Sequence, residues 1–519
     1  MLTSKRTASS RWFQVGFLIV AAAFLFLDLF DLQGTPIAGV DLDQSFYLHN
    51  ATRMLGGQVI YRDFFQFTTP GTESVYFLLF KLFGVHAWIP NATVAALGLG
   101  LVSLAILISK RIFGGASVYL SAALFLVLSF HPAMDGSHHW FSMLAVMGAT
   151  ALIIEERTLG RLAGAGLLCA VASFFTQTRG VGVVFAIALF LWWEHRNREE
   201  DHPPLWKSQA VLWGTFVSAT VALNLPFMIQ TGLRRYLWSI LLFPLKYYSA
   251  DSSLNSFHFS MLRPPRWEQL RFLPDPGWLF VYILIPFVYL ALFVVYMRRR
   301  KGGDVPNSVR LLLLSLVGFF IYLGIASAPT AWRMCIVALP GILLLVWVLN
   351  APGRLRTVVR RGLWSVTIAA AVVIVWKQQT REHEVLETPL GRAVYLDDAA
   401  YQRMKWVAAN THPGDAFFDC SGQAYFLMGL KSPARVSFVS DSDYVRPSQV
   451  EDLVESLDRE QVRVVLWCPE LNVRVRPDDH LDGLRNYLHS HYHPVEVKGN
   501  AGVVWMRNSE ANEASRGTL

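Results

Sequence analysis

Residues 39–71 read GVDLDQSFYLHNATRMLGGQVIYRDFFQFTTPG. This stretch follows one very apolar segment and precedes a long series of others, yet it contains Asp41, Asp43 and Asp63, two arginines and a paired glycine. Charged side chains are costly inside a bilayer. The stretch is therefore expected to be a loop at a membrane surface, and its neighbours along the chain decide on which side it lies.

The composition of the whole chain supports a membrane protein. Its 519 residues are 53% hydrophobic and only 16% charged, whereas about a quarter of the residues in a soluble globular protein are charged. The net charge of +8 comes from short basic clusters between apolar runs, which is the pattern of membrane topology and not of a nucleic-acid-binding face. Membrane lipids are the expected surroundings, with no nucleic-acid partner.

Apolar segments near the length of a bilayer span recur along the chain. A bilayer core of about 30 Å needs roughly 20 apolar residues per helix. Eleven segments approach that length: 12–31, 87–108, 115–131, 139–154, 159–175, 180–194, 208–230, 277–297, 309–328, 333–350 and 362–377. The sequence therefore predicts about eleven transmembrane helices, within one.

The loops between these segments alternate in charge. Every second loop is basic, and these are residues 5–11, 110–111, 157–161, 196–207, 298–301 and 354–361. The positive-inside rule makes this set cytoplasmic. The other set comprises 32–86, 132–138, 176–179, 231–276, 329–332 and everything after 378. An odd number of spans puts the C-terminal part outside. No small-residue cleavage site follows Phe30, so we expect an uncleaved first span with a cytoplasmic N-terminus.

The chain changes character after residue 378. Helix-like and strand-like segments alternate in YQRMKWVAANTHPGDAFFDC and VEDLVESLDREQVRVVLWCP, and AGVVWMRN reads as a last strand. This predicts a small soluble α/β domain at 378–505, followed by a polar, disordered tail at 506–519. Cys420 and Cys468 each end a short apolar run, and they are candidates for a disulfide if this domain is exported.

Within the first outer loop, 32–86, the residues after Asp43 read as a helix. Tyr47, Ala51, Met54 and Leu55 share one face, which predicts an amphipathic helix on the membrane surface, ended by two glycines. Asp43 then has two compatible roles. It is placed to cap the helix, and a cap holds its carboxylate in a fixed position, as a general base requires.

Other outer residues offer binding chemistry. Arg179 lies in a tight connection and Arg333 at the outer end of a span, and a guanidinium there suits either a phosphate or snorkelling to lipid headgroups. Lys246, in the 231–276 loop, belongs either to the cover of a membrane-level cavity or to a surface amphipathic segment. The pair at 138–139 is a metal-ligand candidate by residue type, but water-exposed loop histidines fit better, since no full ligand spacing appears.

Residues 40–71 resemble the first outer loop of the GT-C membrane glycosyltransferases, most closely the bacterial relatives of protein O-mannosyltransferases and the lipid A aminoarabinose transferase. Those proteins carry an Asp-Glu pair, then a Tyr. Here Asp43 takes the position of the family Asp, Gln44 replaces the Glu, and Tyr47 follows. The further matches, in order, are Gly56, Gly57, Tyr61, Arg62, Asp63, Phe64, Phe65, Pro70 and Gly71. WRMCIVALPG extends the similarity to Arg333.

The resemblance implies an inverting glycosyltransferase domain over residues 1–377 of a bacterial inner membrane protein, with the exported domain on the periplasmic or extracellular side. A hexose or pentose would move from a polyprenyl-phosphate donor to an acceptor lipid, glycan or protein. Asp43 would be the general base, with Asp41 a weaker candidate. Asp63 would orient the acceptor or the loop. Arg179, Arg333 and Lys246, with Tyr47, Tyr61 and Arg62 of the motif, would bind substrate.

Three further expectations follow from the residues. Gln44 removes the second carboxylate of the family pair, so no cofactor is expected and a divalent cation is not favoured. A transporter or flippase for a lipid-linked or small solute is the main alternative, but it would place ionisable groups near the middle of its spans, which are almost free of them. A non-catalytic membrane protein with an exported binding domain is the second alternative.

Overall fold

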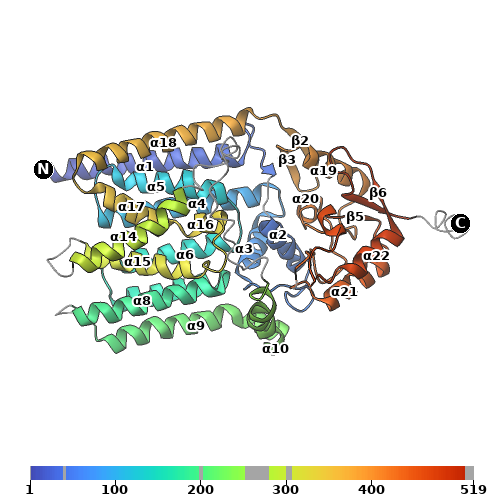
Figure 1. Cartoon of the computed structure of the whole chain (residues 1–519), viewed down its shortest axis with the longest axis horizontal. Coiled ribbons are helices and arrows are strands. Elements are labelled where there is room, and N and C mark those ends of the chain that lie inside the picture. The colour runs from blue at the N-terminus through green and yellow to red at the C-terminus, as the bar shows by residue number, and fades with distance from the viewer. Residues whose placement is uncertain are drawn as a thin grey trace, which may run out of the picture. The chain divides into compact units, whose positions relative to one another are not determined.

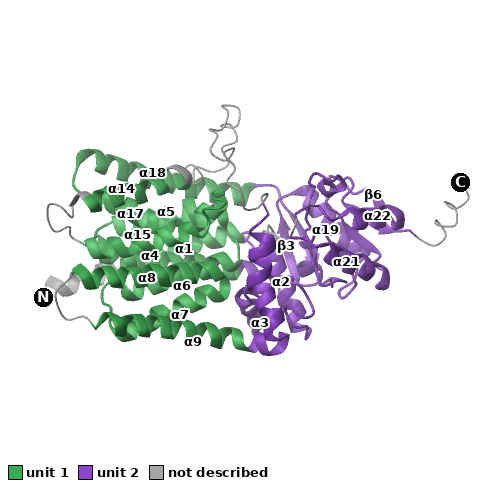
Figure 2. Ribbon diagram, turned by 60° about the horizontal axis from the view of Figure 1, so that its bottom comes forward, with its two compact units in different colours: residues 1–29, 92–225, 257–380 green, residues 30–91, 226–256, 381–519 purple. Residues whose placement is uncertain are grey.

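The computed structural model describes residues 2–38, 42–197, 203–251, 280–299, 307–442, 444–477 and 479–508. The chain divides into two compact units, each built from three separate stretches (Figure 2). Unit 1 comprises Met1–Leu29, Ala92–Leu225 and Phe257–Thr380, and unit 2 comprises Phe30–Asn91, Pro226–Ser256 and Arg381–Leu519. Asp41, residues 252–276 of the predicted outer loop and residues 509–519 of the predicted tail lie outside the described residues.

A helix lies in each of the eleven predicted membrane segments. These helices are α1 (Leu2–Leu29), α4 (Trp88–Ile112), α5 with η1 and η2 (Ser117–Phe125, Leu126–Phe130, His131–Ala133), α6 (His138–Ile153), α7 (Leu159–Phe175), α8 (Gln177–Asn197), α9 (Leu205–Thr231), η6 with α14 (Phe280–Leu284, Ile285–Arg299), α15 (Ser308–Leu323), α16 with α17 (Ala331–Val337, Leu339–Asn350) and α18 (Arg354–Thr380). Among the described residues, four helices are each long and apolar enough to cross a membrane, and α16 with α17 forms a further candidate bent by 67°. The number of spans stays a prediction.

The helices of unit 1 pack through apolar side chains and small residues. Leu101, Ile106 and Phe125 are among its fully buried side chains. Gly180 of α8 allows a close approach to α7, since a Cβ atom there would lie 2.1 Å from the carbonyl oxygen of Cys169. α1 and α18 lie side by side (Figure 1), and the amide of Gln378 donates to the carbonyl oxygen of Asp28 over 2.9 Å. Helices satisfy their own backbone groups, as a bilayer requires.

Unit 2 joins the first outer loop to the C-terminal region through a three-stranded sheet. Its strands are β1 (Ile37–Ala38), β2 (Glu384–Thr388) and β3 (Gly391–Tyr395), in the order β1-β3-β2. β1 runs parallel to β3, with Ile37 opposite Val394, and β2 runs antiparallel to β3. The structure therefore differs from a division at residue 377, because the loop that precedes α2 forms part of the sheet of the C-terminal region.

A second, four-stranded sheet lies further along the chain, in the order β4-β5-β7-β6. Its strands are β4 (Phe418–Asp419), β5 (Val464–Leu466), β6 (Tyr492–Val495) and β7 (Val504–Arg507), and its helical neighbours in sequence are α19 (Asp398–Asn410), α20 (Ala424–Met428), α21 (Pro447–Arg459), η7 (Pro469–Asn472) and α22 (Asp482–His491). Each predicted helix and strand of this region has its counterpart here. β7 continues to Arg507, so two residues assigned to the tail belong to a strand.

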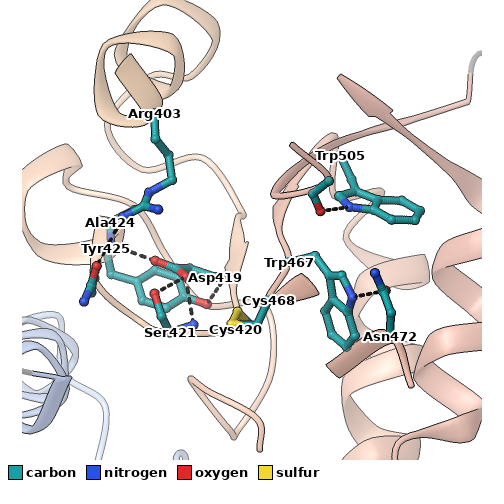
Figure 3. Close-up of a disulfide and its surroundings, with 12 residues drawn as sticks. Arg403, Asp419, Cys420, Ser421, Ala424, Tyr425, Trp467, Cys468, Asn472 and Trp505 are labelled. Atoms are coloured by element: carbon teal, nitrogen blue, oxygen red, sulfur yellow. Dashed lines mark hydrogen bonds between the residues drawn. A yellow bond between two sulfur atoms is a disulfide. The ribbon is translucent and has the colours of Figure 1, made fainter. Parts of the chain in front are cut away.

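Cys420 and Cys468 form a disulfide within unit 2 (Figure 3). Their Cα atoms lie 5.9 Å apart, which is an ordinary separation for a disulfide. Each cysteine follows a strand closely: Cys420 comes directly after β4, and Cys468 lies two residues beyond β5. The two strands run parallel, with Asp419 opposite Leu466, so the pairing brings the cysteines to the same edge of the sheet.

We expect this disulfide to be detectable by counting free thiols, and its removal to destabilise the protein. The chain has four cysteines, of which Cys169 and Cys335 are free. Denatured, unreduced protein should take up two maleimide-polyethylene-glycol labels, and reduced protein four. Cys420→Ser should show three labels without reduction, and the double serine variant should melt at a lower temperature, since closing such a loop contributes up to about 4 kcal/mol. Four labels on unreduced wild-type protein would contradict the pairing.

Candidate functional site

The candidate residues are divided between the two units. Asp43, Tyr47, Tyr61, Arg62, Asp63 and Lys246 belong to unit 2. Arg179 and Arg333 belong to unit 1. Asp41 lies outside the described residues.

Asp43 lies in the first turn of α2, which runs from Leu42 to Leu55. The helix therefore begins two residues earlier than a cap at Asp43 requires, since such a cap would make Gln44 its first residue. At the other end the two glycines stop the helix as predicted: Gly57 has a φ of +87°, and its N–H donates to the carbonyl of Met54. The carboxylate of Asp43 is half-buried. Burial above all raises the pKa of Tyr444 to about 12, and the charge of Asp43 adds a smaller contribution in the same direction.

Several polar residues of α2 are buried, which differs from the exposure expected of an amphipathic helix on a membrane surface. Gln44, His49 and Asn50 are all at most 4% exposed, whereas Leu55 of the expected apolar face is 41% exposed. The reason is that α2 packs against α3 (Gly71–Phe83) on one side and against the C-terminal region on another. The ring of His49 stacks on that of Tyr425, with centroids 4.2 Å apart.

Glu73 of α3 is a buried carboxylate beneath this helix, and the sequence interpretation gave it no role. Its Oε1 accepts a hydrogen bond from the amide of Gln66 over 2.7 Å and another from Asn50 over 3.3 Å. Oε2 has no hydrogen-bond partner among the described residues. Burial, opposed by these hydrogen bonds, raises the pKa of Glu73 to about 7. The burial of Glu73 could not be predicted from the stretch TESVYFLLF, because no local sequence pattern shows that a glutamate faces inward.

The motif tyrosines are held by the loop between α2 and α3. The hydroxyl of Tyr61 donates to the carbonyl of Thr68 over 2.6 Å, and that of Tyr47 lies 3.4 Å from the hydroxyl of Thr68. The amide oxygen of Gln66 accepts from the N–H groups of Phe67 and Thr68. Tyr61 is buried with a φ of +66°, a left-handed conformation that non-glycine residues rarely adopt. The network fixes the loop around both tyrosines.

Arg62 and Asp63 are neighbours that pair with each other. Two guanidinium nitrogens of Arg62 donate to the carboxylate of Asp63 over 2.8 and 2.9 Å, and the backbone N–H of Val59 donates to it over 2.7 Å. The hydrogen bonds from Arg62, above all, lower the pKa of Asp63 to about 2. Asp63 is therefore bound to its own loop, which suits an orienting role better than proton transfer.

Lys246 lies in η4 (Pro244–Tyr248), a turn of π-helix that follows α10 (Leu233–Leu237) and η3 (Trp238–Leu242). Its side chain is exposed, and the ammonium nitrogen lies 5.2 Å from the centre of the Tyr247 ring. The structure thus leaves Lys246 accessible and brings it into contact with an aromatic neighbour.

In unit 1, Arg179 is buried and bonded within the fold. Its guanidinium donates to the carbonyl of His139 over 2.8 Å and to the hydroxyl of Ser142 over 2.5 Å. These bonds tie the first turn of α6 to α8. Arg179 therefore keeps its positive charge, but guanidinium N–H groups that could bind a ligand are already bonded to α6.

Arg333 lies half-buried near the start of α16, where Thr330 caps the helix by accepting from its N–H group. The charges of Arg333 and Arg179 both act on the rings of His138 and His139. The view of these histidines as water-exposed loop residues is wrong. They begin α6, are half-buried, and the ring of His139 meets that of Trp332 at 4.8 Å. The unit brings two arginines and two histidines together.

Comparison with known proteins defines the fold. No protein-family model matches the sequence, and no curated protein matches it. The structure is similar to ArnT from Cupriavidus metallidurans, solved bound to undecaprenyl phosphate, with a TM-score of 0.60 and 12% identity over 96% of this chain and 98% of that one. The apo form of ArnT gives 0.59 and 15% identity, with the same coverage of each chain.

The archaeal oligosaccharyltransferase AglB from Archaeoglobus fulgidus, solved with an inhibitory peptide and a dolichol-phosphate, is similar as well. Its TM-score is 0.52, with 11% identity over 88% of this chain and 69% of AglB. The chain has the fold shared by ArnT and AglB, in agreement with the fold expected from the resemblance of its first loop.

The buried carboxylate of Glu73 gives unit 2 a pH-dependent stability. Its pKa in the folded chain, about 7, lies above the ordinary value of 4.5. Its contribution is therefore full below about pH 4.5 and is lost as the pH rises toward 7, by up to about 3 kcal/mol. Glu73→Gln should flatten this part of the dependence, measured as melting temperature in detergent between pH 4.5 and 7.5.

A matched control is Glu455→Gln, which alters an exposed glutamate on α21 and should keep the wild-type pH dependence. If Glu73→Gln melts with the same pH dependence as wild-type protein, the carboxylate does not titrate where its surroundings place it.

Proposed function

We propose that the chain is an inverting glycosyltransferase that moves a sugar from a polyprenyl-phosphate donor to a lipid, glycan or protein acceptor. The GT-C fold supports glycosyl transfer as the class of reaction. ArnT was solved bound to undecaprenyl phosphate and AglB in complex with a dolichol-phosphate, and these two ligands support a lipid-phosphate donor for this chain as well.

Asp43 is the proposed general base. It removes the proton from the acceptor hydroxyl or amine while that oxygen or nitrogen attacks the anomeric carbon. The bond between that carbon and the phosphate oxygen breaks, and its electron pair leaves with the lipid phosphate. The configuration inverts, because attack and departure occur on opposite faces of the sugar.

The position of Asp43 is the observation that carries this assignment. It lies in the first turn of a 14-residue helix, where the positive end of the helix dipole stabilises an anion. Gln44 and Asn50 of the same helix are buried and bonded to Tyr76 and Glu73 of α3. The half-buried carboxylate of Asp43 is therefore presented from a fixed helix. Asp63 is proposed to hold the loop in shape, as its pairing with Arg62 supports.

The remaining candidate residues are proposed either to contact the substrates directly or to stabilise negative charge from a distance. Arg333 is proposed to contact the lipid phosphate, and the buried Arg179 to stabilise the developing negative charge by its own charge. Tyr47, Tyr61, Arg62 and Lys246 are proposed to line the path of donor or acceptor. No resident cofactor is included, because Gln44 replaces the second carboxylate that the resemblance places beside Asp43.

The proposed location is a bacterial inner membrane, with a cytoplasmic N-terminus and unit 2 on the outer side. The basic loops support this sidedness. The disulfide between Cys420 and Cys468 supports it independently, since disulfides persist in oxidising compartments.

Loss of the base should slow transfer strongly while leaving the fold intact. Purified protein is incubated with defined polyprenyl-phosphate sugars and candidate acceptors, with and without a chelator, and release of the lipid phosphate is followed. Asp43→Asn is expected to lower turnover by roughly 10² to 10⁴-fold, the usual contribution of a general base. Wild-type turnover should be the same in chelator.

Asp398→Asn is the matched control, because Asp398 also lies in the first turn of a helix of unit 2, and it should keep wild-type turnover. Wild-type turnover in Asp43→Asn together with its loss in Asp41→Asn would move the base to Asp41. Activity retained in both variants would refute a carboxylate base in this loop.

Removal of the positive charge of Arg333 or of Arg179 should weaken the complex with the lipid-phosphate donor. Arg333→Ala is expected to raise KM for the donor by about tenfold or more, the value of one lost charged contact. Arg179→Ala should lower kcat as well, and its melting temperature should fall because its bonds to α6 are lost. Unchanged donor affinity in both variants would exclude the phosphate role.

A further inference from the structure

Unit 2 contains a cavity of about 860 Å³, and Tyr61 is the one described residue of its wall to which the proposed function gives a role. The first loop contributes Tyr61 and Phe65 to its wall. The segment that begins at Thr231, the last residue of α9, contributes most of the rest, including Trp238. Gly232, with a φ of +87°, lets the chain turn there from α9 into α10. The volume is that of an ordinary small-ligand site.

The charge in this cavity is of one sign. Arg234, Arg235 and Arg435 line it, and none of the described residues in its wall carries a carboxylate. Arg235 and Arg234 are exposed, and neither forms an ion pair with any carboxylate in the described part of the chain. Arg435, in contrast, forms hydrogen bonds within unit 2. Its guanidinium donates to the carbonyl of Tyr61 over 3.4 Å, and its backbone N–H donates to the carboxylate of Asp452. The cavity therefore has an unbalanced positive charge, suited to an anion.

The surface around the two exposed arginines is apolar. Leu233, Trp238, Leu241, Leu242 and Leu245 are each between 41% and 64% exposed. Such a run beside cationic side chains is typical of a segment at a membrane interface, where arginine reaches the headgroups and tryptophan sits at their level. The preceding helix, α9, is itself one of the candidate membrane spans.

We propose that this cavity binds the phosphate-bearing head group of a membrane lipid. Guanidinium groups hold phosphate oxygens through paired N–H donors. The aromatic wall accommodates the glycerol or first isoprene carbons beside the phosphate, and the exposed leucines contact the hydrocarbon chain. Either an anionic phospholipid or a polyprenyl phosphate carries this chemistry. The proposal does not depend on the proposed function, since lipid can bind here without turnover.

Native mass spectrometry of the full chain in detergent tests the site. The protein is titrated separately with phosphatidylglycerol, a polyprenyl phosphate and inorganic phosphate. Arg234→Ala/Arg235→Ala is expected to raise the apparent Kd of the first-bound lipid about tenfold or more. Arg234→Lys/Arg235→Lys should keep part of the affinity, because charge remains but the paired donors are lost. Asp43→Asn should bind lipid as wild-type protein does, which separates this test from that of the transferase.

The charge-matched control is Arg392→Ala/Arg459→Ala, which removes two exposed arginines of unit 2 that do not line the cavity. It should bind lipid as wild-type protein does. Selective weakening by the cavity variant with one of the two lipids supports the site and identifies its ligand. The proposal would be overturned if the two double alanine variants, in the cavity and in the control, weakened lipid binding equally, or if neither weakened it. Binding of inorganic phosphate as tight as that of lipid would overturn it as well.

Discussion

The carboxylate of Glu73 is the contact on which the first loop depends. One of its oxygens accepts from Asn50 of α2 and from Gln66 of the connecting loop, so α2, α3 and that loop meet at a single atom. The site is closed to water, and either amide would be left buried without a partner if the oxygen were lost. The orientation of α2, and with it that of Asp43, follows from this contact.

The two units satisfy different physical constraints. Unit 1 consists of helices, because a bilayer offers no water to bond backbone groups. Unit 2 contains irregular backbone at the first loop: the left-handed Tyr61, the loop around Thr68 and the short parallel pairing of β1 with β3. Such segments need side-chain and backbone partners of their own, and unit 2 supplies them. The sharp motif of the sequence lies where backbone freedom is available.

Local patterns in the sequence predicted elements well and their surroundings poorly. Apolar length placed a helix in every expected segment, and the glycine pair placed the end of α2 at Leu55. The burial of His49 and Asn50 escaped prediction, because periodicity separates polar from apolar faces but does not say what covers each. The pairing of Ile37 with Val394 escaped it too, since partners so distant in sequence leave no local signal.

The arginines of the predicted outer loops show why residue type alone does not identify a phosphate site. Arg179 donates to a carbonyl and a hydroxyl inside unit 1, and Arg62 gives two nitrogens to its neighbour Asp63. Arg234 and Arg235 have no ion-pair partner among the described residues. A donor already engaged in the fold must exchange a bond to hold a ligand, whereas an exposed one exchanges only water. Electrostatic stabilisation is thus the role open to Arg179, and direct contact with a phosphate the role open to the exposed pair.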